Sequence, residues 1–536
     1  MSPFVAAWLD QQVCRTEAAG QFGKMISMQS LRAFLCLAAV SPVFAALNEP
    51  IRVEQGLLSG IPGAKTEVRI FKGVPFAASP VGDLRWRAPK PAERWDGVRN
   101  ADHFSATCVQ RRPNNAAADQ PPPNEDCLYL NIYTPAKSAA DKLPVMVWIH
   151  GGSFTSGAGS IYDGEDLARQ GVVVVTVNYR LGVFGFFAHP ELTRESAHKA
   201  SGNYGVLDQV AALQWVQKNI AAFGGDTKRV TIFGESAGSW SINFLVATPL
   251  ARGLFQRAIG ESGAQFAPIQ KLAQAEQTGA KFATSVGANA LAELRAKSAD
   301  DLQKAGGFSG PDIDGWLLPD EVYTIFAKGK QNDVPLLIGS NADEGTMFAP
   351  ATAVAESVRE QARRRYGPNT TAFLKLYPFQ TDTEARTVQA EVIRDELFGW
   401  EMRTWARMQN KTGKSKVYLY FFSRVPPGAT SARMGSYHSA EIAYVFRHTN
   451  DSNRPWEDVD HKVSEAMSSY WVNFAATGDP NGKGLPKWPA YRVSSDQAMG
   501  FGDKIELIPL PHQPALDFFD GYFERVRSSP ESEPQP

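Results

Sequence analysis

The chain has 536 residues, of which 43% are hydrophobic and 21% are charged. This composition is ordinary for globular proteins, so it excludes disordered, collagen-like and fibrous classes. Lys and Arg number 55, and Asp and Glu number 56, which leaves a formal net charge of −1. Such a balance gives no basic surface for nucleic acid and no acidic tail for a basic partner.

Residues 1–45 have the pattern of a secretory leader. Val43 and Ala45 follow the apolar stretch Ala33–Val40 and stand where signal peptidase prefers small side chains, so we expect cleavage after Ala45. Met25 or Met28 would start a leader of normal length. The apolar stretch is about half of the ~20 residues that a membrane-spanning helix needs. We therefore expect a secreted or periplasmic protein without a transmembrane segment; a buried first helix is the alternative.

The cysteines agree with export. Cys14 and Cys36 fall in the predicted leader, which leaves Cys108 and Cys127 in the mature chain. An even number of cysteines in an oxidising compartment predicts a disulfide. Two unpaired, buried thiols are the alternative.

Short β-branched runs alternate with longer helical patterns along the mature chain. The runs are apolar without alternation, as in strands that are covered on both faces; they are Val145–Ile149, Val172–Asn178, Val230–Phe233, Leu336–Ile338 and Val417–Phe421. Residues 204–223 carry apolar side chains at helical spacing. This order predicts an α/β fold with a mostly parallel sheet and helices on both faces.

The C-terminal part contains two other kinds of segment. Residues 351–415 are rich in charged helical sequence and predict an accessory helical region, whereas residues 528–536 have the composition of a disordered tail. We expect residues 46–527 to form a single domain that includes the accessory helices.

The strongest chemical signal is Gly234-Glu235-Ser236-Ala237-Gly238, the only G-x-S-x-G sequence in the chain. It directly follows a predicted strand and precedes a run that is compatible with a helix. A serine on such a sharp turn requires glycine two residues before and after it, because larger side chains would collide. Ser236 is therefore the candidate nucleophile.

A serine nucleophile needs a general base, and a third group must orient that base. The usual chain order for this turn is nucleophile, acid, base. That order leaves His438, His448, His461 and His512 as candidate bases. We favour His438, which lies in a flexible polar segment after a predicted strand, whereas the sequence around His448 and His461 indicates solvated side chains.

The acid should follow a strand that lies between the nucleophile and the base. Residues 339–345, which follow the strand Leu336–Ile338, offer two adjacent carboxylates, Asp343 and Glu344. Composition does not separate them.

Acyl transfer also needs backbone N–H donors for the oxyanion. The loop His150–Phe154 follows a predicted strand and is rich in small residues, so it is suited to supply them. The N–H of Ala237, directly after the candidate nucleophile, is a further expected donor.

Together these motifs resemble the type B carboxylesterase and cholinesterase family of α/β hydrolases, over residues 51–491. The blocks that carry the resemblance, besides the serine motif, are Phe71–Ala77, Pro80–Arg85, Glu125–Asn131, Asn178–Gly182, Phe223–Asp226, Trp471–Phe474 and Thr477–Asn481.

The resemblance implies a role for individual residues. Ser236 matches the family nucleophile, Glu344 the acid and His438 the base. Cys108 and Cys127 match a disulfide of the family. The resemblance thus selects Glu344 over its neighbour as the acid.

The resemblance also assigns oxyanion donors and scaffold residues. Gly152 and Ser153 match the donors of the oxyanion loop, although the family commonly has glycine where Ser153 stands. Because the donor is a backbone N–H, we expect the function to survive. The remaining matches indicate scaffold or core positions: ion-pair or capping residues at Arg180, Asp208 and Asp226, a buried serine at Ser262, and a core side chain, or else a wall of the acyl pocket, at Trp240.

These observations predict a serine carboxylesterase that acts on a small-molecule ester through an acyl-enzyme, with no metal and no organic cofactor. One alternative is a lipase, or a specialised esterase or carbamate hydrolase, of the same fold. The alternative from another class is a non-catalytic, cholinesterase-like binding protein.

Overall fold

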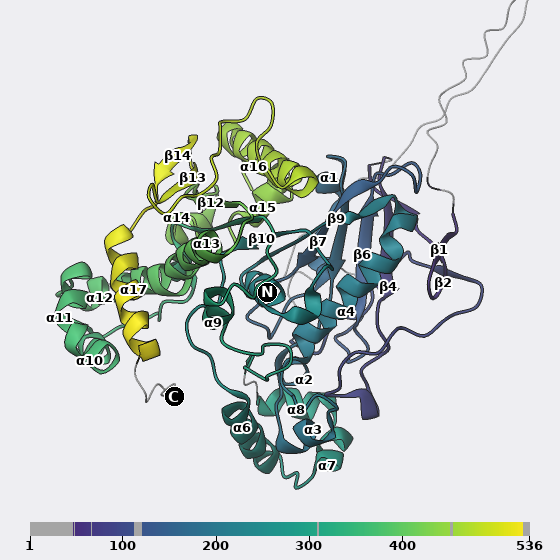
Figure 1. The fold of residues 1–536 in the computed structure, drawn as a ribbon, viewed down its shortest axis with the longest axis horizontal. Coiled ribbons are helices and arrows are strands. Elements are labelled where there is room, and N and C mark those ends of the chain that lie inside the picture. Colours follow the sequence, from purple (N-terminus) through teal and green to yellow (C-terminus); the bar gives the residue numbers. More distant parts are fainter. Residues whose placement is uncertain are drawn as a thin grey trace, which may run out of the picture. The chain divides into compact units, whose positions relative to one another are not determined.

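A large mixed sheet forms the centre of the protein (Figure 1). The computed structural model describes residues 47, 49–65, 67–111, 120–307, 310–450 and 454–528. The predicted leader, its cleavage site and residues 529–536 of the predicted tail lie outside these ranges. Within them, an 11-stranded sheet has the strand order β14-β13-β12-β11-β10-β9-β7-β8-β6-β4-β3.

The strands of this sheet are β3 Ile61–Pro62, β4 Arg69–Pro75, β6 Tyr129–Thr134, β7 Leu143–Ile149, β8 Val173–Val177, β9 Gly225–Glu235, β10 Arg257–Glu261, β11 Leu336–Asn341, β12 Val417–Phe422, β13 Gln497–Phe501 and β14 Ile505–Pro509. A smaller sheet consists of β1 Ile51–Val53, β2 Gly56–Ser59 and β5 Val98–Asn100.

Helices occupy most of the connections between the strands. They are α1 Glu165–Ala168, α2 Gly182–Gly185, α3 Pro190–Glu195, α4 Tyr204–Asn219, α5 Ala237–Ala247, α6 Leu272–Ser285, α7 Leu291–Ala296, α8 Ala299–Ala305, α9 Val322–Ala327, α10 Ala355–Tyr366, α11 Thr370–Leu376, α12 Asp382–Ile393, α13 Trp400–Thr412, α14 Ala429–Met434, α15 Ile442–Val445, α16 Asp458–Thr477 and α17 Gln513–Ser528. The helix predicted over residues 204–223 is α4, followed by a 3-10 turn, Ile220–Phe223.

The middle of the large sheet is parallel, as predicted. Every neighbouring pair from β13 to β8 runs parallel. All five predicted strands are present, and β9 is longer than expected because it begins at Gly225. The outer pairs, which involve β14 at one edge and β6, β4 and β3 at the other, are antiparallel and were not predicted.

Each face of the sheet carries its own hydrophobic core. Along β7, Val147 and Ile149 belong to the core that includes α4, whereas Trp148 belongs to the opposite core, which includes α16. Successive side chains of a strand point to opposite faces. Helices therefore cover both faces, and the predicted two-sided burial of the strands is confirmed.

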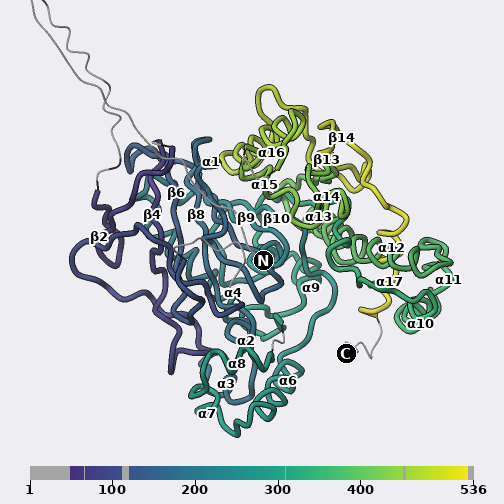
Figure 2. The backbone as a smooth tube through the Cα atoms, turned by 180° about the vertical axis from the view of Figure 1, so that it is seen from behind, coloured from purple at the N-terminus to yellow at the C-terminus, as the bar shows by residue number. Residues whose placement is uncertain are grey.

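The accessory region predicted over residues 351–415 is helical. Helices α10 to α13 lie in it, and a π-helical turn, Arg394–Gly399, joins α12 to α13. The C-terminal helix α17 lies beside these helices in both views (Figures 1 and 2), where Tyr366 of α10 contacts the rings of Phe518 and Tyr522. Ser528 is the last residue of α17, so the tail predicted from residue 528 is wrong at this position.

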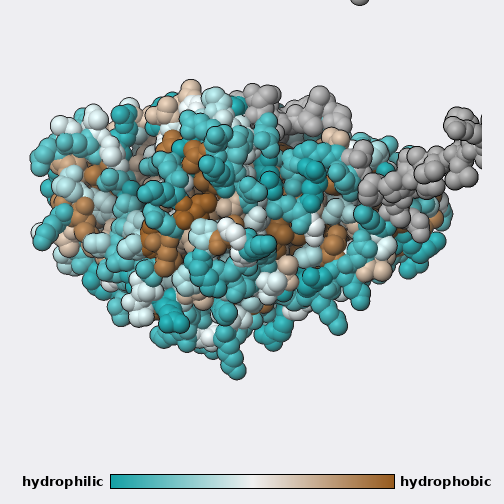
Figure 3. Space-filling view, turned by 90° about the horizontal axis from the view of Figure 1, so that it is seen from above, coloured by the Kyte–Doolittle hydropathy of each residue, from teal (hydrophilic) through white to brown (hydrophobic). Residues whose placement is uncertain are grey.

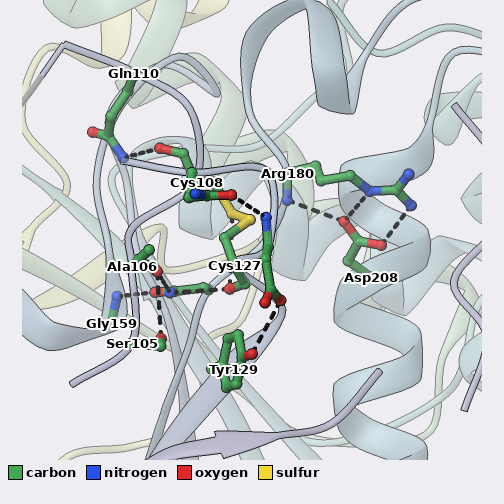
Figure 4. The surroundings of a disulfide bond; sticks show 12 residues. Ser105, Ala106, Cys108, Gln110, Cys127, Tyr129, Gly159, Arg180 and Asp208 are labelled. Atoms are coloured by element: carbon green, nitrogen blue, oxygen red, sulfur yellow. Dashed lines mark hydrogen bonds and ion pairs between the residues drawn. A yellow bond between two sulfur atoms is a disulfide. The ribbon is translucent and has the colours of Figure 1, made fainter. Parts of the chain in front are cut away.

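A disulfide joins Cys108 to Cys127 (Figure 4). The side-chain amide of Asn178 donates to the carbonyl oxygen of Cys127 at 3.2 Å. Close by, the guanidinium of Arg180 donates two hydrogen bonds, of 2.8 and 2.7 Å, to the carboxylate of Asp208 on α4. The predicted ion-pair role of these two residues is confirmed.

The surface is mostly polar, with a few apolar places. Figure 3 shows one largely hydrophilic face on which hydrophobic residues gather toward the middle. Large exposed hydrophobic side chains include Met347, Phe348 and Leu397. Among the described helices, none is both long enough and apolar enough to cross a membrane.

Candidate active site

Ser236 lies on a strained turn between β9 and α5. Its φ of 56° and ψ of −125° are unusual for a residue with a side chain. A Cβ on Gly234 would lie 2.5 Å from the carbonyl oxygen of Ile149, and a Cβ on Gly238 would lie 2.0 Å from the same atom. Steric exclusion therefore explains both glycines of the motif, as predicted.

His438 contacts Glu344 in the interior of the protein. Its Nδ1 lies 2.6 Å from Oε2 of Glu344, at hydrogen-bond distance. The other carboxylate oxygen of Glu344 accepts the backbone N–H of Asn341 at 2.7 Å. With both of its oxygens engaged, the carboxylate has a fixed orientation toward the imidazole ring.

Asp343 has a different contact from its neighbour. Its Oδ2 accepts the backbone N–H of Ser436 at 2.8 Å, and its own N–H donates to the carbonyl oxygen of Ser436 at 3.1 Å. Of the two adjacent carboxylates, Glu344 thus reaches His438 directly, whereas Asp343 holds the segment that carries His438.

The Nε2 atom of His438 faces the residue before the candidate nucleophile. It lies 3.1 Å from Oε1 of Glu235. Within the described chain, this nitrogen has no hydrogen-bond partner, so it makes no hydrogen bond to Ser236. The structure thus pairs Nδ1 of His438 with Glu344. Its Nε2 faces Glu235, the residue that directly precedes Ser236.

The candidate oxyanion loop lies against Ser236. A Cβ on Gly151 would come within 3.0 Å of the Cβ of Ser236. Gly152 has a φ of 101°, and a Cβ there would lie 2.2 Å from the carbonyl oxygen of Ser156. Ser153 follows with a φ of 53°. The backbone N–H groups of Gly152, Ser153 and Ala237 donate no hydrogen bond to any described residue, so they can serve a ligand.

His150 fixes the start of this loop. Its ring stacks on Tyr179 at a centroid distance of 4.4 Å, and the Tyr179 hydroxyl donates to the carbonyl oxygen of His150 at 2.8 Å. Burial lowers the pKa of His150 to about 4, so its ring is neutral at neutral pH. This histidine supports the loop and does not reach the pair of His438 and Glu344.

Carboxylates dominate the electrostatics around His438. Burial opposes a charge on its ring, but the neighbouring carboxylates of Glu235 and Glu344 outweigh burial and raise the pKa of His438 to about 9. Burial raises the pKa of Glu235 to about 8. Because the two groups are in contact, the protonation of one depends on that of the other.

The sequence profile of the Carboxylesterase family matches residues 48–518. The chain belongs to this family. Fumonisin B1 esterase from Sphingopyxis macrogoltabida is 36% identical over 500 residues, which cover 88% of this chain and 90% of the relative. Para-nitrobenzyl esterase from Bacillus subtilis (strain 168) is 37% identical over 471 residues, which cover 82% and 92% of the two chains.

A solved structure of PNB esterase matches this carboxylesterase with a TM-score of 0.78 and 34% identity, over 88% of this chain and 99% of that chain. The predicted α/β-hydrolase fold is therefore confirmed, and so is the predicted family. Membership supports carboxylic ester hydrolysis as the activity of the chain.

Other residues singled out in the sequence have mixed outcomes. Asp226 pairs with Arg229 at 2.9 Å, as expected of a scaffold residue. Ser262 is fully buried, but its hydroxyl has no hydrogen-bond partner among the described residues. His448 lies at the surface, where its Nε2–H donates to the carbonyl oxygen of Asp163 at 3.0 Å.

Several residues near His438 were not predicted. Glu235 is one of them. It lies inside the serine motif, and its position next to Ser236 could have indicated that it lies close to the catalytic histidine. The rings of Phe348 and Phe398 lie 5.0 and 4.9 Å from the imidazole ring. Phe398 lies in the π-helical turn of the accessory region, and no local motif marks it.

Proposed function

We propose that this carboxylesterase hydrolyses small-molecule esters through an acyl-enzyme on Ser236. The observation that carries the proposal is the buried contact of 2.6 Å between His438 and Glu344, on the segment that faces the Ser236 turn. A base with an oriented partner beside a strained serine is the arrangement that nucleophilic acyl transfer requires.

In the proposed reaction, Nε2 of His438 accepts the hydroxyl proton of Ser236 while Oγ attacks the ester carbonyl carbon. The negative oxygen of the tetrahedral intermediate accepts hydrogen bonds from Gly152, Ser153 and Ala237. The C–O bond to the alcohol then breaks, and His438 gives its proton to the leaving alkoxide. Water, deprotonated by the same histidine, then attacks the acyl-enzyme. The bond between the acyl carbon and Oγ breaks, His438 returns the proton to Oγ of Ser236, and the acid leaves.

The other residues have supporting roles. Glu344 keeps the proton of His438 on Nδ1, so that Nε2 can accept a proton, and stabilises the imidazolium that forms. Glu235 favours the protonated form of His438 in the free enzyme. Asp343 positions the segment that carries His438 and takes no part in proton transfer.

We also propose that the protein is secreted or periplasmic and that residues 46–527 form one domain. The disulfide supports an oxidising compartment. The described residues all belong to one compact unit, which supports the single domain.

Replacement of Ser236 tests the function. We expect Ser236→Ala to abolish turnover of p-nitrophenyl acetate while the melting temperature stays near that of the wild type. Ser262→Ala is the matched control, because this second buried serine makes no side-chain hydrogen bond to the described residues, and it should retain activity. Rapid quenching and mass spectrometry should find an acyl group on Ser236.

Turnover that survives in Ser236→Ala would refute the serine mechanism. A folded wild type that binds esters without any turnover would instead favour the non-catalytic binding protein. A sharp rise of activity at an oil–water interface would favour a lipase over an esterase for soluble substrates.

A further inference from the structure

Trp240 stands out on the helix that follows the candidate nucleophile. Every other residue of α5 is buried, whereas Trp240 is partly exposed. Its backbone N–H donates to the carbonyl oxygen of Ser236 at 2.9 Å, so it lies one helical turn after the nucleophile. Helical side chains lean toward the N-terminus of their helix. The indole ring therefore leans toward the turn that carries Ser236 and stays partly exposed.

Trp240 is the middle member of an aromatic wall, which we define as Phe154, Trp240 and Phe398. Its ring stacks with Phe154 at 6.4 Å and with Phe398 at 6.5 Å, at interplanar angles of 28° and 25°. Phe154 directly follows Ser153 of the oxyanion loop, and Phe398 contacts His438 at 4.9 Å. The wall thus extends from the oxyanion loop to the catalytic histidine.

The indole is fixed in this position. Its Nε1–H donates to the carbonyl oxygen of Ala264, in the loop after β10. The same loop is tied to α13, because the carboxylate of Glu401 accepts the N–H groups of Phe266 at 2.6 Å and Ala267 at 3.0 Å. The ring cannot swing away from the site without losing its hydrogen bond, so the wall is preorganised.

The direction of the acyl chain follows from the other three substituents of the tetrahedral carbon. One is Oγ of Ser236, a second is the oxyanion at the loop, and the third is the leaving oxygen at His438, which must protonate it. The acyl group takes the fourth direction. We assign this direction to Trp240, which lies on the helix that follows Ser236 and is partly exposed.

We propose that Trp240 sets the acyl-chain limit of this carboxylesterase: its indole closes the acyl side of the site, so that esters of short acids are accepted and esters of long acids are excluded. The proposal rests on the proposed function and adds the substrate class. The sequence left open whether Trp240 is a core side chain or a wall of the acyl pocket. Because Trp240 is partly exposed, we favour the wall.

The test measures kcat/KM for p-nitrophenyl esters with acyl chains of increasing length, and for acetate esters of alcohols of increasing size. In Trp240→Ala, we expect the ratio of octanoate to acetate to rise by at least about tenfold, because several methylenes gain a pocket. The relative rates of the acetate esters should stay as in the wild type. Trp240→Phe, which keeps a ring, should show a smaller rise.

Leu245→Ala is the matched control, since Leu245 is fully buried on the same helix. It should lower the melting temperature and leave the octanoate-to-acetate ratio unchanged. Should Trp240→Ala not fold, Trp240→Leu carries the same test.

An unchanged acyl ratio in a folded Trp240 variant would overturn the proposal, and so would a change confined to the alcohol series. A wild type without turnover that depends on Ser236 would refute the proposed function, and this inference with it. The two failures are therefore distinguishable.

Discussion

Glu344→Gln removes the charge of the carboxylate that contacts His438 and keeps its shape. In the wild type, Nδ1 and Oε2 lie 2.6 Å apart, and the carboxylate is fully buried, so water cannot replace the lost charge. The glutamine amide can also donate to Nδ1, which places the histidine proton on Nε2, where it blocks proton transfer from Ser236. The same kind of change in a serine protease triad costs about 10⁴-fold in kcat, or about 5 kcal/mol of barrier.

The adjacent residue provides a matched control. Asp343→Asn keeps an oxygen that can accept the N–H of Ser436, which donates to Oδ2 at 2.8 Å in the wild type. Only the charge on this hydrogen bond is lost, so we expect a loss of about 1 kcal/mol in the free energy of unfolding and at most about a tenfold loss of kcat/KM.

The assay is kcat/KM for p-nitrophenyl acetate, with thermal unfolding measured on the same preparations. We expect Glu344→Gln to lose activity with a nearly unchanged melting temperature, and Asp343→Asn to stay active. Equal losses, or the reverse order, would refute the assignment of Glu344 as the partner of His438.

Three further predictions concern the surroundings of the site. Glu235→Gln removes a carboxylate that raises the pKa of His438, so the acid limb of the pH profile of kcat/KM should move to lower pH by about one unit; an unmoved limb would contradict the coupling. Cys108→Ala with Cys127→Ala should lower the free energy of unfolding by about 3 kcal/mol, measured by urea denaturation, and an unchanged value would show that the disulfide does not stabilise the fold. Ser153→Gly should raise stability by about 1 kcal/mol by relieving its positive φ and should retain activity; a large loss of kcat would mean that the side chain itself takes part.

The parallel centre of the fold was predictable because its signals are local. Each central strand is a continuous apolar run, which two-sided burial requires, and α4 shows its buried stripe in the sequence. The edge strands were not predictable in the same way. Residues 129–134 form a short segment of mixed polar and apolar side chains, and their antiparallel pairing depends on β4 and β8, which are distant in sequence.

At the site, too, features that depend on neighbouring residues were predictable, whereas features that depend on tertiary contacts were not. Ser236 was predictable because its turn imposes glycine at fixed positions. The choice between Asp343 and Glu344 needed a family resemblance, since both residues follow the same strand and only tertiary contacts separate them. Phe398 left no signal, because its contact with His438 depends on how a π-helical turn of the accessory region packs onto the sheet.

The ionisation state of the buried carboxylates is the property of the site that the sequence predicts least well. Four buried glutamates lie near one another, and a count of residues would assign each of them a negative charge. They are Glu235, Glu261, Glu344 and Glu441. Burial raises the pKa of Glu441 to about 7 and that of Glu235 to about 8, and it raises the pKa of Glu261 well above its ordinary value. Ionising all of them together in a buried cluster would cost several kcal/mol per charge. Burial therefore favours the protonated forms of Glu235, Glu261 and Glu441, whereas Glu344 is the carboxylate that contacts His438 directly.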